Sequence, residues 1–225
     1  MGLLEKTLNL AKKATERVID TAGKKIEEAR QKRIEEEQKF LREFPYKHRY
    51  TIRQKDSVSV DLVFGDVLER DSYVVYDADD EPVYMANGTV LMGKHHFVIT
   101  NREKEELAKV NKALVNMPIP FMKERKSCMI EVAGEESFEM DTYISSGERE
   151  YSIYHSDLTI KADANGTEFR LVDRKTRKTC VHIYKVRSDE GFFKDKYYVG
   201  FDDETKKMMA ICAAIGIDTI RFSED

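Results

Sequence analysis

The sequence contains no tryptophan, four prolines and three cysteines, which are Cys128, Cys180 and Cys212. An odd number of cysteines, none of them in a Cys-x-x-Cys pair, indicates neither a disulfide framework nor a thiolate zinc site. Thiols stay reduced in the cytoplasm, and we therefore expect a cytoplasmic protein. No segment approaches the roughly 18 apolar residues of a membrane-spanning helix, so any association with a membrane is expected to be peripheral.

The local signatures of common catalytic and nucleotide-binding sites are also missing. The sequence has no Gly-x-Ser-x-Gly, no phosphate-binding glycine loop and no dinucleotide fingerprint. His95 and His96 are adjacent, and neighbours on a regular strand point to opposite faces, so this pair does not predict a metal site. The net charge of -4 shows no bias toward nucleic acid. We expect a non-enzymatic protein without a cofactor and without a nucleic-acid partner.

What is present begins with a highly charged helical pattern. Residues 1–44 carry 11 Lys+Arg and 9 Asp+Glu, and Phe44-Pro45 marks the expected end, because the residue before a proline leaves the helical region. The apolar residues recur at helical spacing, namely Leu4, Leu8, Ala11, Val18, Ala22, Ile26 and Ala29. We predict a charged amphipathic helical extension over residues 1–44. It is open whether this helix packs on the remainder of the chain, on a second copy or on a membrane surface.

From residue 45 to residue 225 the chain is built from short β-branched and aromatic runs. Clusters of turn-forming residues separate these runs, and this spacing predicts an antiparallel sheet or barrel. The predicted turns are Asp77–Pro82, Ala86-Asn87-Gly88, Ala133-Gly134, Ala164-Asn165-Gly166 and Ser188–Gly191.

An internal repeat resolves one ambiguous segment. Residues 96–112, HFVITNREKEELAKVNK, and residues 168–185, EFRLVDRKTRKTCVHIYK, follow the same plan of strand, charged turn and strand. With a one-residue gap, Ala108, Val110 and Lys112 align with Val181, Ile183 and Lys185. Residues 105–114 have helical propensity. The alignment nevertheless predicts a strand there.

The segment from Met208 to Ile217 has no polar side chain except the thiol of Cys212. A helix that is apolar on every side is normally buried in protein. We predict this central helix at about residues 203–215, with Gly216 as its C-cap and a last short strand over residues 217–222. A barrel that holds a helix needs more than eight strands. The predicted fold is therefore α+β, a closed antiparallel β-barrel of about 10–12 strands around a buried C-terminal helix, which buries Met208, Met209, Ile211, Cys212 and Ile215.

The order of these segments resembles a known family. The segments follow one another as in the LURP-one-related proteins: the hairpin YVVYDADDEPVYMA, the first repeat copy, the run YSIYHSDLTIKA, the second repeat copy, the run DKYYVGF and an apolar C-terminal helix. Those proteins are grouped with phospholipid scramblases and the tubby C-terminal domain. The resemblance covers residues 46–222 and implies a barrel of roughly twelve strands around a hydrophobic helix. The proline-rich N-terminus and the cysteine cluster of scramblases are absent here.

Two groups of residues are candidates for binding. The predicted turn DRKTRK places four basic residues together, and the corresponding turn of the other repeat copy adds two more. Such residues attract anionic phospholipid headgroups, although a charged turn can also be merely solvated. These candidates are Arg174, Lys175, Arg177, Lys178, Arg102 and Lys104.

The second group lies where the resemblance to scramblases implies a calcium segment, at Asp202, Asp203 and Glu204. Calcium prefers oxygen ligands, but acidic residues before a helix are also the residues expected to cap it, and capping is the reading we favour.

The sequence therefore favours a non-enzymatic tubby-like barrel that binds anionic lipid at a membrane surface. Two alternatives stay open. One is a protein-interaction or scaffold module that associates with a partner, or with itself, through residues 3–43. The other is scramblase-like lipid transfer, which only the resemblance implies.

Overall fold

A computed structural model of the chain describes residues 24, 28, 31–32, 34–35, 37–55, 62–67, 72–91, 94–113, 123–145, 148–187 and 193–221. The chain divides into two compact units, Met1–Pro45 and Tyr46–Asp225. In the first unit, the described residues from Lys24 to Glu43 are helical, and the helix ends just before Phe44 and Pro45, as predicted. All residues of the predicted apolar stripe, from Leu4 to Ala29, lie outside the described residues.

The second unit consists of strands followed by a C-terminal helix. Its described elements are β1 (His48–Lys55), β2 (Leu62–Val63), β3 (Asp66–Val67), β4 (Tyr73–Tyr76), β5 (Pro82–Leu91), β6 (Lys94–Thr100), β7 (Glu106–Ala113), β8 (Lys123–Val132), β9 (Phe138–Ser145), β10 (Glu148–Tyr154), β11 (Leu158–Ala162), β12 (Glu168–Asp173), β13 (Thr179–Arg187), β14 (Phe193–Phe201), the short 3₁₀ helix η1 (Glu204–Lys206) and α2 (Lys207–Arg221).

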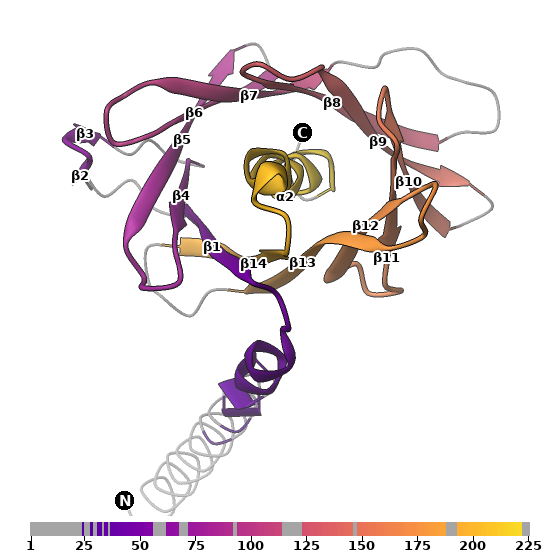
Figure 1. Ribbon diagram of the computed structural model, residues 1–225, viewed down its shortest axis with the longest axis horizontal. Helices are drawn as coiled ribbons and strands as arrows, with labels where there is room; N and C mark the ends of the chain where they lie inside the picture. The colour runs from indigo at the N-terminus through magenta and orange to yellow at the C-terminus, as the bar shows by residue number, and fades with distance from the viewer. Residues whose placement is uncertain are drawn as a thin grey trace, which may run out of the picture. The chain divides into compact units, whose positions relative to one another are not determined.

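Twelve of these strands form one sheet in the order β10-β9-β8-β7-β6-β5-β4-β1-β14-β13-β12-β11, and every described pairing is antiparallel. The sheet curls into a nearly closed barrel, and α2 lies inside it (Figure 1). The predicted α+β barrel around a C-terminal helix is thus confirmed, with a strand number inside the expected range. Only β10 and β11, at the two ends of the strand order, are not paired with each other.

The antiparallel pairing assigns each turn to one end of the barrel, because the chain reverses direction at every strand. The β4–β5, β6–β7, β8–β9, β10–β11 and β12–β13 connections share the end at which α2 begins, which we call the proximal end. At the other, distal end, Arg221 of α2 donates to the carbonyl oxygen of Asn165 in the β11–β12 turn, over 3.0 Å. The helix of 15 residues, about 22 Å long, therefore runs through the barrel from one end to the other.

The core forms between α2 and the inward-facing residues of the strands. Ile211, Cys212 and Ala213 are completely buried, and every residue of α2 from Met209 to Ile220 is buried. The predicted core residues Met209, Ile211, Cys212 and Ile215 are among them. Met208 is different, because it is only partly buried and lies at the proximal edge of the core.

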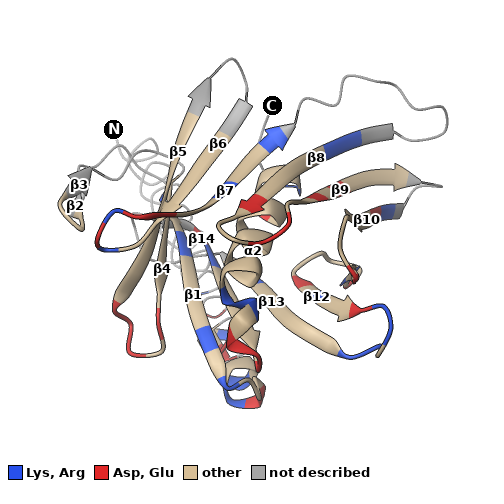
Figure 2. Ribbon diagram, turned by 45° about the horizontal axis from the view of Figure 1, so that its top comes forward, with Lys and Arg blue, Asp and Glu red and all other residues tan. Residues whose placement is uncertain are grey.

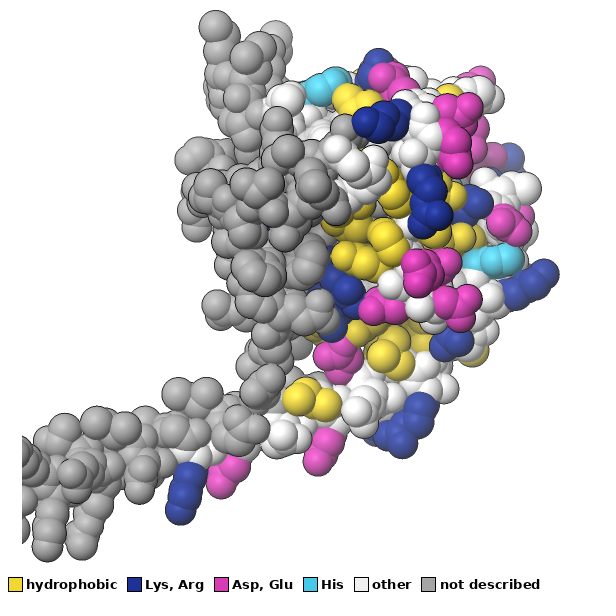
Figure 3. Space-filling model, turned by 90° about the vertical axis from the view of Figure 1, so that its left-hand side faces the viewer, with side chains coloured by type: hydrophobic (Ala, Val, Ile, Leu, Met, Phe, Trp, Pro, Cys, Tyr) yellow, Lys and Arg dark blue, Asp and Glu magenta, His cyan; other side chains and the backbone are white. Residues whose placement is uncertain are grey.

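A second, smaller cluster lies on the outer face of β4 and β5. Val74 and Met85 are buried there and pack with Val63, Phe64 and Tyr76. Figure 3 views the barrel from the side that carries β4 and β5, where hydrophobic side chains lie among charged side chains of both signs.

The structure corrects three local predictions at the C-terminus. The helix does not end at residue 215, Gly216 is not its C-cap, and residues 217–221 are helical rather than a strand. A Cβ atom on Gly216 would lie 3.0 Å from the sulfur of Cys128 and 3.2 Å from Ile130 Cδ1. Gly216 therefore lets α2 approach β8 closely, and the helix continues to Arg221.

Most described turns lie where they were predicted, at Asp77–Pro82, Ala133-Gly134 and Ala164-Asn165-Gly166. The predicted turn at Ala86-Asn87-Gly88 is wrong, because these residues lie inside β5. A Cβ atom on Gly88 would come within 2.5 Å of the Phe97 ring, so this glycine makes room for an aromatic side chain on β6. The predicted turn at Ser188–Gly191 lies outside the described residues.

The internal repeat is confirmed in the pairing of the strands. Ile99 pairs with Ala108 between β6 and β7, as Leu171 pairs with Val181 between β12 and β13, and each pair is followed by a register shift. Glu106–Ala113 is a strand, as the repeat predicted against local propensity. In the described part of the chain, no helix is both long and apolar enough to span a membrane.

Candidate functional site

The basic turn between β12 and β13 is held in one conformation by its own backbone. The Asp173 carboxylate accepts hydrogen bonds from the backbone N–H groups of Lys175 (2.9 Å) and Thr176 (2.6 Å). Arg177 has a positive φ of 60° and donates its backbone N–H to the carbonyl of Asp173. Hydrogen bonding to Thr176 lowers the pKa of Asp173, so the turn keeps its carboxylate at neutral pH. Lys175, Arg177 and Lys178 are exposed on this fixed turn.

The fourth predicted residue of this turn is directed differently. The guanidinium of Arg174 donates from Nε to the carbonyl of Leu158 (2.9 Å) and from Nη2 to the carbonyl of Ile153 (2.8 Å). These two carbonyls belong to β11 and β10, the two strands of the barrel that are not paired with each other. Arg174 therefore links these strands. We remove it from the candidate headgroup ligands.

Arg102 and Lys104 do not join the basic turn. They lie in the β6–β7 turn, and β5, β4, β1 and β14 separate β6 from β13 in the sheet. Arg102 lies over the ring of Phe64, 5.6 Å from its centroid. Its neighbours on the rim are acidic, since Asp77, Asp79, Asp80 and Glu81 follow β4. Figure 2 shows the red turn after β4 and the blue turn after β12 at separate places on the barrel.

The three candidate calcium ligands are engaged with separate partners. The Asp202 carboxylate accepts from the backbone N–H of Lys47 (3.1 Å), and Glu204 pairs with Lys207 (3.4 Å). Asp203 caps η1 by accepting from the N–H (3.0 Å) and hydroxyl (2.8 Å) of Thr205. Among the described residues, no group of three or more His, Cys, Asp or Glu side chains is placed to hold a metal ion. This geometry supports the capping role of Asp203 and gives no support to a calcium site.

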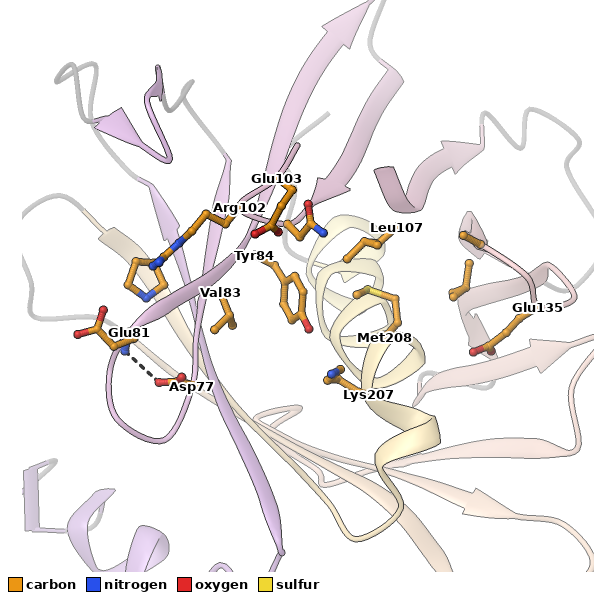
Figure 4. Close-up of a pocket in the computed structure, with 14 residues that line it drawn as sticks. Asp77, Glu81, Val83, Tyr84, Arg102, Glu103, Leu107, Glu135, Lys207 and Met208 are labelled. Carbon is orange, nitrogen blue, oxygen red and sulfur yellow. Dashed lines mark hydrogen bonds between the residues drawn. The ribbon is translucent and has the colours of Figure 1, made fainter. Parts of the chain in front are cut away.

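A groove of about 870 Å³ opens at the proximal end beside α2. Val83 and Tyr84 of β5 lie on one side, and Lys207 and Met208 of α2 lie on the other (Figure 4). The wall is partly apolar and carries four carboxylates against two basic side chains, from Asp77, Glu81, Glu103, Glu135, Arg102 and Lys207. This groove is acidic, and it explains why Met208 is not buried.

A buried polar cluster that was not predicted from the sequence surrounds Asp218, which is only 2% exposed. Its carboxylate accepts hydrogen bonds from the hydroxyls of Tyr73 and Tyr197 and from Lys185 Nζ, the last over 3.1 Å. Lys185 also pairs with Asp195 at 3.0 Å. Burial, and then the nearby Asp218 carboxylate, raise the pKa of Tyr197 well above its usual value, so its hydroxyl remains a donor. The repeat contained a partial signal, because it gave Lys185 the same strand face as the inward residues Val181 and Ile183.

The three cysteines have different environments. Burial raises the pKa of the Cys128 and Cys212 thiols far above the usual value, and both residues are completely buried. Cys180 is partly exposed.

Together, the fold and these surfaces define a nearly closed antiparallel barrel around a central helix, with charged surfaces on its rim. No protein-family model and no curated protein matches the chain. Among solved structures, the X-ray structure of a protein from Arabidopsis thaliana is similar, with a TM-score of 0.42 and 9% sequence identity. That alignment covers 76% of this chain and 90% of the Arabidopsis chain. Similarity of this size supports no statement about what the chain does.

Proposed function

We propose that the chain is a non-enzymatic binding module of the LURP-one-related, tubby-like type, which meets anionic phospholipid headgroups through the β12–β13 turn. One observation carries the proposal: Lys175, Arg177 and Lys178 are exposed together on a turn whose backbone is fixed by Asp173. A preformed turn loses little conformational entropy when it binds. The acidic turn after β4 lies elsewhere on the rim, and salt at about 0.1 M screens exposed charges beyond about 10 Å.

The expected affinity is modest, because not all of the positive charge is available. Lys175 pairs with Asp157 at 2.7 Å, and both side chains are exposed. Exposed pairs contribute little to stability, so this pair can exchange for a phosphate at small cost. At about 1 kcal/mol for each basic residue near an anionic surface, three cations supply about 3 kcal/mol.

Replacing Lys175, Arg177 and Lys178 together by Ala is expected to weaken binding to anionic vesicles on the order of a hundredfold. The melting temperature should change little, since exposed substitutions usually stay within about 0.5 kcal/mol. Arg174 is kept in this variant because it braces β10 and β11. The measurement is co-sedimentation with phosphatidylserine-containing vesicles and with neutral vesicles, at low and high salt.

The matched control is Arg102→Ala combined with Lys104→Ala, which removes two cations from the acidic side of the rim. We expect this control to bind anionic vesicles as the unmodified chain does. If the unmodified chain fails to sediment with anionic vesicles at low salt, or if the two variants behave alike, the lipid proposal is wrong.

A protein-interaction role is the second candidate, and the acidic groove beside α2 favours it. Its apolar wall and its excess of carboxylates suit a partner segment that combines basic and apolar side chains. In that case a lysine-rich amphipathic peptide should bind the barrel, and its glutamate-rich counterpart should not. This binding should be unaffected by the three Ala substitutions in the β12–β13 turn.

A further inference from the structure

The barrel is open along one line, between β10 and β11, which we call the open seam. These strands are the two ends of the strand order, and among the described residues no backbone hydrogen bond joins them. Complete closure of a barrel removes all edge strands, and the open seam leaves two. An edge strand presents N–H and C=O groups on which another extended chain can pair.

The hairpin turn after β11 fixes which of its backbone groups face the seam. Asp163 donates its N–H to the carbonyl of Glu168, and this closes the β11–β12 ladder. Because ladder bonds recur at every second residue, Lys161 faces β12, whereas Ile160 and Ala162 turn their N–H and C=O groups toward the seam. The carbonyl of Leu158, two residues before Ile160, points to the same side, and it accepts the hydrogen bond from Arg174.

The same reasoning applies to β10. The carbonyl of Ile153 faces the seam, because it accepts a bond from Arg174 Nη2. Tyr151 and Arg149 lie two and four residues before Ile153 on the same strand, so their backbone groups also face the seam. Arg174 thus bridges the proximal part of the seam. In the distal part, Arg221 donates hydrogen bonds to the hydroxyl of Tyr151 on β10 and to the carbonyl of Asn165 in the β11–β12 turn. Neither bridge uses the seam-facing backbone groups of Ile160 and Ala162.

A cleft of about 560 Å³ occupies the distal part of the seam. Its lining includes Arg149 and Tyr151 from β10, Ile160 and Ala162 from β11, and Arg221 from the end of α2. The four strand residues are those whose backbone groups were assigned to the seam from the ladder. Two independent observations, the hydrogen-bond pattern and the open volume, therefore identify the same place.

Two basic side chains, Arg149 and Arg221, line the cleft. The lining also contains two acidic residues. The Asp163 carboxylate accepts the N–H groups of Thr167 and Glu168, both at 2.7 Å, and is used by its own turn. Glu150 is exposed and lies on the opposite face of β10 from Arg149, so the field inside the cleft favours a carboxylate.

We propose that an extended, acidic segment of a partner polypeptide docks into the open seam as an additional strand. Its backbone pairs with Ile160 and Ala162 of β11, and a carboxylate of the segment lies between Arg149 and Arg221. Backbone pairing supplies affinity, and the two guanidinium groups select for negative charge. The site is separate from the β12–β13 turn, so this inference stands or falls independently of lipid binding.

The test uses the full chain to select from a random-peptide phage library, followed by affinity measurement with the selected synthetic peptides. Acidic sequences with alternating β-branched residues should be enriched. Ala162→Pro removes an N–H that faces the seam, and proline is tolerated on an edge strand in that position. This variant should keep its melting temperature and lose binding at least tenfold. Lys161→Pro removes an N–H from the β12 ladder instead, and it should lower the melting temperature.

Charge selection is tested by a second matched pair of variants. Arg149→Gln should weaken binding of the acidic peptides about tenfold, since a hydrogen bond to a charged group is lost. Lys161→Gln makes the same change of charge on the exposed face of β11 and should leave binding unchanged. The inference is overturned if no acidic peptides are enriched, if Ala162→Pro binds normally, or if the two glutamine variants behave alike.

Discussion

An Ala213→Glu variant is expected to be largely unfolded at 25 °C. Ala213 is completely buried in α2, inside the barrel. A carboxylate placed there loses its water and gains no described cationic partner on the adjacent helix turns, where Met209, Ala210 and Ile217 are also buried. Burial of an unpaired charge costs several kcal/mol, which is comparable to the total stability of about 5–15 kcal/mol of an ordinary domain. Ala210→Glu should behave in the same way.

The matched control places the same side chain at the proximal start of the helix. Lys206→Glu adds a carboxylate in η1, where the N-terminal end of α2 favours negative charge, so the fold should be preserved. Circular dichroism and thermal melts provide the measurement. An Ala213→Glu protein that melts within a few degrees of the unmodified chain would show that α2 is not inside the barrel.

The second large effect is expected at Asp218. Asp218→Ala leaves the hydroxyls of Tyr73 and Tyr197 without their shared acceptor, and it removes one of the two carboxylates that pair with Lys185. Removal of one partner from a buried ion pair typically costs about 3–5 kcal/mol. Because Lys185 retains Asp195, we expect the lower part of this range in a urea-unfolding measurement.

A double variant separates the cost of broken partners from the value of the cluster itself. Asp218→Leu with Lys185→Met replaces both charges by apolar groups, which is often close to neutral for a buried pair. The double variant should therefore be more stable than the sum of the two single effects predicts. Strict additivity would contradict the assignment of Asp218 and Lys185 to one interacting cluster.

Local sequence patterns correctly predicted the elements whose structure follows from their own hydrophobic pattern. The repeat assigned Glu106–Ala113 to a strand because its partner copy, with Val181 and Ile183, is unambiguous in sequence. The apolar run after Met208 predicted a buried helix because solvent is unfavourable on all of its faces. Both conclusions follow from hydrophobic pattern alone.

The errors occurred where a distant contact overrides a local signal. Gly88 and Gly216 were interpreted as turn and cap residues. Instead, Gly88 makes room for the Phe97 side chain of β6, and Gly216 of α2 makes room for the Cys128 side chain of β8. Asp218 was expected in a last strand, whereas Lys185 and two tyrosines stabilise it inside the helix. Arg174 looked like its basic neighbours in sequence, and only the positions of β10 and β11 show that it is a brace.

These contacts explain why the candidate sites were less predictable than the fold. The basic turn was visible in the sequence because its members are consecutive. The acidic groove and the open seam are assembled from residues of several strands, and the seam exists only because β10 and β11 do not pair. Sequence spacing on one strand carries no information about a missing bond to another.

The most direct test of the central position of α2 is native-state hydrogen exchange of its backbone amides, measured on the full chain. The helix α2 lies inside the barrel, which leaves the rim and the seam as the surfaces available for binding. Amides from Ile211 to Ile220 should therefore exchange only when the whole barrel unfolds, with a free energy equal to that of global unfolding. Exchange of these amides as fast as the exposed turn at Asp77–Glu81 would contradict the central position of α2.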